Sequence, residues 1–222
     1  MFGLSKRLIE PELLDHADLA DAQVNLQELV LLNKRFGGHS TIRKLLQQAA
    51  LEQKPFTLLD VGAASGDSGR LIREIYPQAR VTNFDCNAVN LANAPHPKLI
   101  GDAFRMPFSP ASFDYVFCSL LLHHFKDAQV TELLRDFGRI ARQGVLICDL
   151  ERNVLPYLFM MVSQPLFRWH RITVHDGQTS FRAALSAAEL LELAKAAGLP
   201  NPDVKIHRPA FRLTLIAQKA SA

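Results

Sequence analysis

The stretch Thr57-Leu-Leu-Asp-Val-Gly-Ala-Ala-Ser-Gly66 decides the fold of this chain. Its mostly apolar residues at 58–61 predict a parallel strand, because such a strand is covered on both faces and carries a nearly continuous apolar run. The strand ends in a turn of small residues, and a helix is predicted over residues 68–76, where Pro77 stops it. Bare backbone and the start of a helix then lie together at the turn, which makes it a place for a ligand.

The spacing of the small residues in the turn distinguishes two classes of ligand. A dinucleotide site is typically G-x-G-x-x-G, whereas Gly62, Ala64 and Gly66 form G-x-A-x-G. This pattern resembles motif I of the class I S-adenosylmethionine (SAM)-dependent methyltransferases, in which a glycine usually stands in place of Ala64. The resemblance implies that SAM contacts the residues of the turn, namely Asp60, Gly62, Ala63, Ala64 and Gly66. A tight strand–helix turn that binds nothing is the alternative.

A second carboxylate closes the next predicted strand. Residues 80–85 form a short β run that ends in Asp85, about 20 residues after the turn. A carboxylate at this place accepts hydrogen bonds from both ribose hydroxyls of a bound nucleoside. We therefore expect Asp85 to bind the ribose, with Cys86 beside it in the cofactor site.

The most specific stretch is Gly101-Asp-Ala-Phe-Arg-Met-Pro-Phe-Ser-Pro-Ala-Ser-Phe-Asp-Tyr-Val116. It closely resembles a block of the quinone- and small-molecule-type class I methyltransferases, the Methyltransferase-11/25-like group. In that family the aspartate that matches Asp102 accepts a hydrogen bond from the adenine amino group, and the residue that matches Ala103 offers its backbone to the ring. The resemblance also places Ser119, at the end of the following strand, beside the motif I turn.

The resemblance implies an α/β fold with a Rossmann-like sheet of seven strands. The expected strand order is 3-2-1-4-5-7-6, with strand 7 antiparallel and helices on both faces. We expect a single domain over residues 1–222, made of a helical cap at 1–54 and a core at 55–222. Within the cap, one helix is capped by Asp21 and a second opens at Ser40. Family members often use such helices as a lid over the active site; a packing layer without ligand contact is the alternative.

Composition limits the class of protein further. The chain has 222 residues, of which 48% are hydrophobic, as suits one folded domain. Its formal net charge is only +3 and no basic run occurs, so we expect no nucleic-acid partner. The three cysteines, Cys86, Cys118 and Cys148, form no metal-binding pattern and fit reduced thiols. Neither a signal-peptide core nor a spanning segment is evident, and a cytoplasmic protein is expected.

Three histidines are candidates for a general base. SAM carries an activated methyl group, so the protein has to align a nucleophile and, for a hydroxyl acceptor, remove a proton. His123 and His124 follow the fourth predicted strand, at the edge of the sheet where substrate meets cofactor. His175 lies beside Asp176 in residues 171–181, which we expect to form an ordered loop able to close over the site. Structural roles are the alternative for all three: packing, solvation or a stabilised turn.

Other classes of acceptor leave patterns that this chain lacks. Enzymes that methylate the amino groups of adenine or glutamine carry Asn/Asp-Pro-Pro-aromatic after the fourth strand, where residues 119–122 are Ser-Leu-Leu-Leu. Cytosine C5 enzymes need a nucleophilic cysteine, usually after proline, but Cys118 follows Phe117 within a predicted buried strand. No cluster of Asp and Asn points to magnesium, so no metal is expected.

Residues 155–169 are unusually apolar and follow the fifth predicted strand. Their two prolines predict a bent, partly mobile segment. We expect Phe159, Met160 and Phe167 to line the acceptor pocket, because methionine and aromatic side chains suit a greasy ring or alkyl chain. A core helix over the sheet is the alternative. The basic residues within 168–171 offer an edge for transient contact with a membrane surface.

Together these features predict an enzyme, a SAM-dependent methyltransferase. Its expected acceptor is a small hydrophobic molecule of phenolic, polyketide or quinone-like type, methylated on oxygen because histidines are available as bases. C-methylation of a quinone-type ring, a nicotinamide-dependent oxidoreductase and a non-catalytic SAM-binding protein are the alternatives. The oligomeric state is left open.

Replacing Asp85 by alanine is expected to weaken SAM binding ten- to a hundredfold. The reason is that a hydrogen-bonded carboxylate at a buried site contributes about 1.5–3 kcal/mol. Isothermal titration calorimetry measures the change. An affinity within about twofold of wild type would remove Asp85 from the binding site.

Overall fold

The sheet has the predicted order of seven strands. The computed structural model describes residues 6–49, 51 and 54–219, so parts of the expected cap 1–54 and both limits of the expected domain 1–222 lie outside the described residues. The strand order is β3-β2-β1-β4-β5-β7-β6, and every neighbouring pair is parallel except the two that involve β7. The strands are β1 (Thr57–Val61), β2 (Arg80–Asp85), β3 (Lys98–Ile100), β4 (Phe113–Ser119), β5 (Ala141–Leu150), β6 (Asp203–His207) and β7 (Arg212–Gln218).

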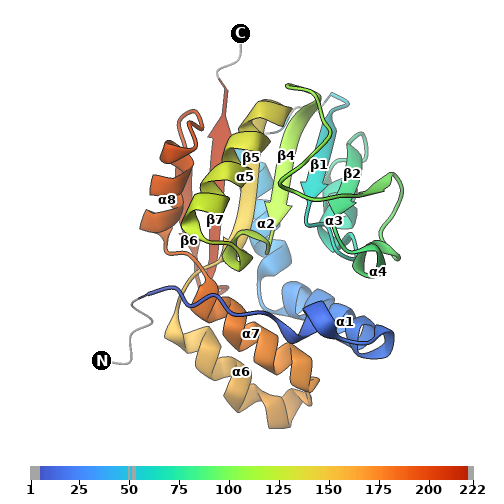
Figure 1. The fold of residues 1–222 in the computed structure, drawn as a ribbon, viewed down its shortest axis with the longest axis vertical. Helices are drawn as coiled ribbons and strands as arrows, with labels where there is room; N and C mark the ends of the chain where they lie inside the picture. Colours follow the sequence, from blue (N-terminus) through green and yellow to red (C-terminus); the bar gives the residue numbers. More distant parts are fainter. Residues whose placement is uncertain (1–5, 50, 52–53, 220–222) are drawn as a thin grey trace.

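Alternate side chains of the central strands face two separate apolar cores. Leu58 and Phe117 pack into one core and Leu59 and Val116 into the other, as the two-residue period of a strand requires. The first core includes α2 (Gly38–Ala49) and α3 (Asp67–Ile75), and the second includes α5 (Asp127–Ile140) and α8 (Ala187–Ala196). Helices therefore cover both faces of the sheet, as predicted (Figure 1).

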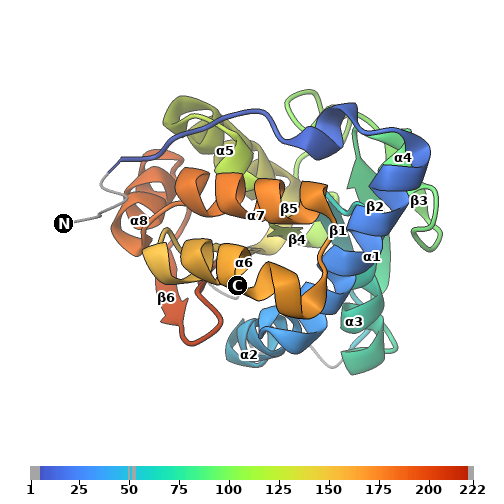
Figure 2. The same ribbon diagram turned by 90° about the horizontal axis from the view of Figure 1, so that it is seen from below.

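A third group of elements lies beyond the carboxyl ends of the parallel strands (Figures 1 and 2). It comprises η1 (Leu13–His16), α1 (Leu19–Arg35), η2 (Leu122–His124), α6 (Val154–Phe167) and α7 (Arg171–Ala183), while the short α4 (Ala88–Leu91) follows β2. Residues 6–12 cross α7, where the N–H of Leu8 donates to the carbonyl of Arg182 (3.1 Å). Among the described residues, no helix combines the length and the apolar character that crossing a bilayer requires.

The two N-terminal helices begin earlier than predicted. Asp18, rather than Asp21, caps α1, because its carboxylate accepts a hydrogen bond from the N–H of Asp21 (2.9 Å). Helix α2 begins at Gly38, so Ser40 lies inside its first turn and donates its hydroxyl to the carbonyl of Gly37 (2.9 Å). Both differences shift the start of a helix by two or three residues, and in α2 the apolar residues Ile42, Leu45 and Leu46 are buried.

The prediction of a bent segment over residues 155–169 is wrong, and so is its alternative of a core helix. Helix α6 is continuous over Val154–Phe167, and most of its large apolar side chains are exposed. Pro156 is tolerated because it lies in the first turn, where backbone N–H groups have no partner within the helix. Asn153 caps this turn by accepting a hydrogen bond from the N–H of Leu155 (3.0 Å).

The expected loop at residues 171–181 is a helix as well. The ring of His170 accepts a hydrogen bond from the N–H of Ile172 (3.4 Å) and caps α7. Gly177, which favours a turn in isolation, instead allows α7 to approach α6 closely. A Cβ atom at this position would lie 2.8 Å from the terminal methyl of Met160.

Candidate functional site

The turn between β1 and α3 has the tight geometry that its small residues predict. Gly62 has a φ of 74°, and its N–H donates to the carbonyl of Phe84 (2.9 Å). A Cβ atom on Gly62 would lie 3.0 Å from the Leu121 side chain, so both the backbone and the space require glycine. Gly66 has a φ of 75° and caps α3. Ala64 also has a positive φ, 44°, which favours the glycine usual at this place of motif I.

Asp85 lies at the end of β2, beside the turn. Its two carboxylate oxygens accept hydrogen bonds from the N–H groups of Ala64 and Asn87, both at 2.8 Å. The side chain is buried, and each oxygen keeps a further lone pair for a ligand. Asp85 therefore shapes the turn, a role that spacing alone did not indicate.

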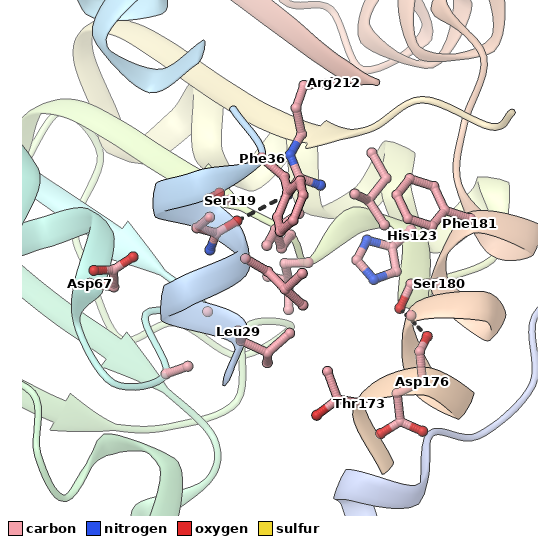
Figure 3. A pocket seen from close by; sticks show the side chains of 18 of the residues that line it. Leu29, Phe36, Asp67, Ser119, His123, Thr173, Asp176, Ser180, Phe181 and Arg212 are labelled. Carbon is pink, nitrogen blue, oxygen red and sulfur yellow. Dashed lines mark hydrogen bonds between the residues drawn. The ribbon is translucent and has the colours of Figure 1, made fainter. Parts of the chain in front are cut away.

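A cavity of about 1260 Å³ opens at the carboxyl edge of the sheet. Residues at the ends of β1, β2, β4 and β5 form its floor, and α1, α6, α7 and residues 9–14 contribute to its walls. In Figure 3, Asp67 lies on one side of the pocket, and His123, with Ser180 and Asp176 of α7, lies on the other. A site for one small ligand usually encloses about 300–1,000 Å³, so this cavity has room for two molecules.

Most of the predicted site residues line this cavity. They are Gly62, Ala63, Ala64, Asp85, Cys86, Ser119, His123, His124, Phe159 and Met160. The structure does not bring six others to its lining, namely Asp60, Gly66, Asp102, Ala103, Phe167 and His175.

The residues that do not line the cavity have other partners. Asp102 is exposed, and its carboxylate accepts a hydrogen bond from a backbone N–H two residues further on (2.9 Å). The side chain of His175 is 50% exposed, and its Nδ1 lies 2.9 Å from Asp176, which agrees with the structural alternative for this histidine. Phe167 stacks on Trp169 with ring centroids 5.1 Å apart. His175 is therefore withdrawn as a candidate base.

His123 and Asp149 form a buried pair at the edge of the sheet. His123 lies in η2 after β4, Asp149 lies near the end of β5, and the parallel pairing of these strands brings the two side chains together. His123 Nδ1 lies 2.7 Å from Asp149 Oδ1. Because a carboxylate accepts hydrogen bonds, Nδ1 carries the proton and the lone pair of Nε2 is free to accept another.

The pKa values of the two neighbouring histidines move in opposite directions. Burial lowers the pKa of His123, but the charge and hydrogen bond of Asp149, with a contribution from Glu12, raise this pKa above its ordinary 6.5 overall. Burial and the charge of His123 lower the pKa of His124 to about 3. The two rings lie 4.3 Å apart, and His124 is neutral at pH 7.

Glu12 approaches both histidines from the N-terminal segment, a contact that sequence reasoning missed. Its Oε1 lies 3.9 Å from His123 Nε2 and 4.0 Å from His124 Nδ1, and it accepts a hydrogen bond from the Ser180 hydroxyl. No local pattern marks Glu12, because the contact depends on where the segment crosses α7. The sequence does contain a signal for Asp149. This residue directly follows the predicted fifth strand, and His123 follows the fourth strand, which is its neighbour in the sheet.

We name residues 6–16 the N-terminal strap. The guanidinium of Arg7 donates hydrogen bonds to the carbonyls of Phe125 and Ala183, both at 2.8 Å. The carboxylate of Asp176 accepts hydrogen bonds from two consecutive N–H groups of η1, at 2.8 and 2.9 Å. These contacts hold the strap across the cavity, on the side of the histidines.

Glu12, His123 and His124 are the one group of potential metal ligands found among the described residues. Two ligands of a tetrahedral zinc ion lie about 3.3 Å apart, given metal–ligand distances of roughly 2.0–2.1 Å. The glutamate oxygen lies 3.9 and 4.0 Å from the two histidine nitrogens, which is wider than this spacing. The expectation of a metal-independent site stays a prediction, and activity in the presence of a chelator tests it.

Comparison with known proteins agrees with this geometry. Residues 59–148 match the family model described as a methyltransferase domain. This part of the chain is similar to a methyltransferase domain. Demethylmenaquinone methyltransferase of Thermotoga maritima is 30% identical over 125 residues, which cover 53% of this chain and 54% of that protein. Malonyl-[acyl-carrier protein] O-methyltransferase of Hahella chejuensis is 25% identical over 179 residues, which cover 73% and 57%. The chain thus spans about half the length of these curated relatives.

Solved structures share the fold of this chain. Human N-acetylserotonin methyltransferase in complex with SAM has a TM-score of 0.63 and 16% identity, covering 90% of this chain and 57% of that chain. The plantazolicin methyltransferase in complex with SAH, S-adenosylhomocysteine, has a TM-score of 0.66 and 12% identity, covering 90% and 89%. At these identities the likeness concerns the fold.

The part of the cavity beside the motif I turn fits SAM. The bare backbone of Gly62 lets an extended ligand pass close to the main chain. Asp85 lines the same part of the cavity, and its two carboxylate oxygens keep lone pairs for a ligand. Asp67 and Asp85 also place two carboxylates on this wall, which suits the positive charges of a sulfonium and an ammonium group.

Asp60 lies behind the motif I turn. Its side chain is 1% exposed, and Oδ2 has no hydrogen-bond partner among the described residues. Burial, and then the charge of Asp85, raise the pKa of Asp60 to about 8, against the opposing effect of Arg73. The ionised carboxylate therefore destabilises the fold.

Asp60→Asn is expected to raise stability, and to do so more at about pH 8 than at about pH 5. The pKa is about 8 in the folded protein against an ordinary value of 3.8, so the folded state binds more protons between these values. Wild-type stability therefore falls as pH rises through this interval and levels off above it, whereas the amide does not titrate. Melting temperatures at both pH values measure the effect. The same difference at both values would contradict the prediction.

Proposed function

We propose that this protein is a SAM-dependent methyltransferase that methylates a hydroxyl group on a small hydrophobic compound of phenolic, polyketide or quinone-like type. The observation that carries the proposal is that His123, which is paired with Asp149, lines the same cavity as the motif I turn. A positioned base beside the place of the cofactor is what a hydroxyl acceptor needs.

Two side chains of the pair have distinct roles in the proposed reaction. SAM, when bound, supplies a methyl group that needs no further activation. His123 Nε2 accepts the proton that the acceptor hydroxyl loses as its oxygen bonds to the methyl carbon and the carbon–sulfur bond breaks. Asp149 holds the imidazole in one orientation and stabilises the imidazolium that forms. Because the pKa of His123 is raised, kcat/KM should increase with pH until this pKa is passed.

Apolar side chains form the acceptor part of the cavity. They come from α1, α6 and α7 and include Leu29, Phe36, Phe159, Met160 and Phe181. Phe36 contacts Phe159 with ring centroids 5.2 Å apart. Such a wall suits an aromatic ring or an alkyl chain and excludes water from the reacting atoms.

Arg212 adds a positive charge to this cavity. Its side chain is buried, and Nη2 donates a hydrogen bond to Asn33 Oδ1 (3.0 Å). Arg212 forms no ion pair with any residue that the structure describes. A positive charge nearby favours the deprotonated form of a phenol, which is the better nucleophile.

The N-terminal strap supports the role of a lid. It lies over the histidines and is fixed by Arg7 and Asp176 at both ends of its contact with α7. A cover at this place keeps water from the acceptor hydroxyl while the proton is transferred.

C-methylation of a quinone-type ring is the second candidate reaction. The relative from Thermotoga maritima is named a demethylmenaquinone methyltransferase. Removal of a ring hydroxyl proton by His123 would also activate a ring carbon, so the same pair serves both reactions. Proton NMR of the product separates an O-methyl from a C-methyl group.

Two further readings are tested by binding. Isothermal titration with SAM and with NADH separates a methyltransferase from a nicotinamide-dependent oxidoreductase, and SAM alone is expected to bind. Tight SAM binding without turnover on a panel of phenols and hydroquinones would favour a non-catalytic SAM-binding protein.

His123→Ala is expected to lower turnover by about 10²–10⁴ while SAM affinity stays nearly unchanged, because only the proton acceptor is lost. Turnover is measured on any phenol or hydroquinone of the panel that the wild type methylates, and calorimetry measures SAM binding. The matched control is His175→Ala, which alters a half-exposed histidine not found in the cavity lining and should keep wild-type turnover. Full activity of His123→Ala would mean that His124 is the base or that the reaction needs no protein base.

Phe159→Ser is expected to raise the KM for the methylated phenol and to leave SAM affinity unchanged, because Phe159 lines the acceptor wall. Phe167→Ser is the matched control, since this residue lies in the same helix and is similarly exposed but does not line the cavity. Equal effects of the two substitutions on KM would place the acceptor elsewhere.

A further inference from the structure

Helix α6 exposes a continuous apolar stripe. Leu155, Leu158, Phe159, Val162 and Leu166 follow the i, i+3, i+4, i+7, i+11 spacing that places side chains on one face of a helix. All five are exposed, Val162 by 76% and Leu166 by 77%. A neighbouring face of α6 already packs inside the protein through Pro156, Met160 and Ser163. The stripe is thus a second apolar face: its Phe159 contacts Phe36 at the cavity (ring centroids 5.2 Å), while Leu158, Val162 and Leu166 stay exposed.

The whole of α6 lacks charge. None of its 14 residues is Asp, Glu, Lys or Arg, whereas a helix that faces water normally carries charged residues on its outer side. An apolar surface of this kind on a folded protein marks an interaction site.

Basic residues gather at the C-terminal end of α6. Arg168 and Arg171 follow the helix, and both are exposed. Lys34 and Arg35 end α1, and the next residue, Phe36, contacts Phe167 with ring centroids 5.8 Å apart. Two carboxylates also lie near this end: Asp21, 3.9 Å from Arg171, and Glu28, which accepts a hydrogen bond from the N–H of His170.

We propose that the apolar stripe of α6 docks on the surface of a lipid bilayer that carries anionic headgroups, with this basic end against the headgroups. An apolar helix face flanked by Lys and Arg is the pattern of a helix that lies in the membrane interface. With 14 residues, α6 is shorter than the roughly 20 needed to span a bilayer, so the contact is along its side.

The charge of the basic end distinguishes a bilayer from a second copy of this chain. In a two-fold dimer through α6, the same patch occurs on both subunits and self-complementarity is required. The stripe has no charged residue and its C-terminal end is mainly basic, so few opposite charges are present to orient a second copy of this chain. Anionic headgroups, in contrast, complement the Lys and Arg side chains directly.

The position of the stripe connects the bilayer to the cavity. Leu155 and Phe159 belong to the stripe and also line the cavity, so they lie at its mouth. A hydrophobic acceptor dissolved in the bilayer would enter past these side chains without crossing water. Docking itself does not depend on the proposed reaction and is measured without an acceptor.

Vesicle co-sedimentation tests the proposal with the full chain. Wild-type protein is expected to bind vesicles of phosphatidylcholine mixed with phosphatidylserine, and to bind more weakly to phosphatidylcholine alone or at high salt. The double variant Val162→Asp, Leu166→Asp should weaken binding at least about tenfold, because two apolar anchors become charged. Arg168→Gln and Arg171→Gln should each weaken it about fivefold.

Ile206→Asp is the matched control. Ile206 is an exposed apolar residue of β6 that does not line the cavity, so this variant adds a carboxylate elsewhere and should bind vesicles as the wild type does. Melting temperature and SAM affinity confirm that each variant is folded. Wild-type protein that ignores phosphatidylserine vesicles, or unchanged binding of the Val162→Asp, Leu166→Asp variant, overturns the proposal. A dimer in light scattering that this variant dissociates, without vesicle binding by the wild type, assigns the stripe to a second copy instead.

Discussion

The carboxylate of Asp149 holds the proposed catalytic edge of the sheet together. It accepts hydrogen bonds from His123 Nδ1 (2.7 Å) and from the N–H groups of Leu122 (2.8 Å) and Leu150 (2.7 Å). These donors belong to η2, which follows β4, and to the end of β5, and the register Cys118↔Ile147 keeps these two strands side by side. All these groups are buried. Because a buried donor without a partner costs free energy, the loss of one of these hydrogen bonds would disturb the others. The orientation of the His123 imidazole follows from this network. The N-terminal strap contacts the neighbouring backbone through Arg7, which donates a hydrogen bond to the carbonyl of Phe125.

The two halves of the cavity are built in different ways. The half assigned to SAM comes from one compact unit, the turn between β1 and α3, with Asp85 supplied by the neighbouring strand. The half assigned to the acceptor combines α1, α6, α7 and the N-terminal strap, which lie far apart in the chain. Asp176 joins two of these parts, because its carboxylate accepts hydrogen bonds from η1. The acceptor half therefore depends on more separate elements than the half assigned to SAM.

Errors of the sequence-based predictions of secondary structure concentrate in the acceptor half. Residues 171–181 resemble a loop because of Gly177, yet this glycine serves close packing of α7 on Met160. The prolines of α6 suggest a bend, but one lies where a helix tolerates proline. For Gly177, contact between helices overrules the local preference for a turn. In the cofactor half the signals are local, and Gly62 and Asp85 lie where their spacing predicts, although Asp60 and Asp102 do not line the cavity.

The sequence by itself determined the strand order, the motif I turn and the position of His123 and His124 at the edge of the sheet. Each of these depends on residues that are close together in the chain or on motifs that resemble those of a known family. Three features were decided only by the tertiary structure. Glu12 lies close to these histidines, His175 does not line the cavity, and the apolar stripe of α6 faces outward. Such contacts depend on how separate elements pack after the sheet has formed. Side-chain packing between distant segments leaves no periodic signal in either segment, so the sequence alone does not show it.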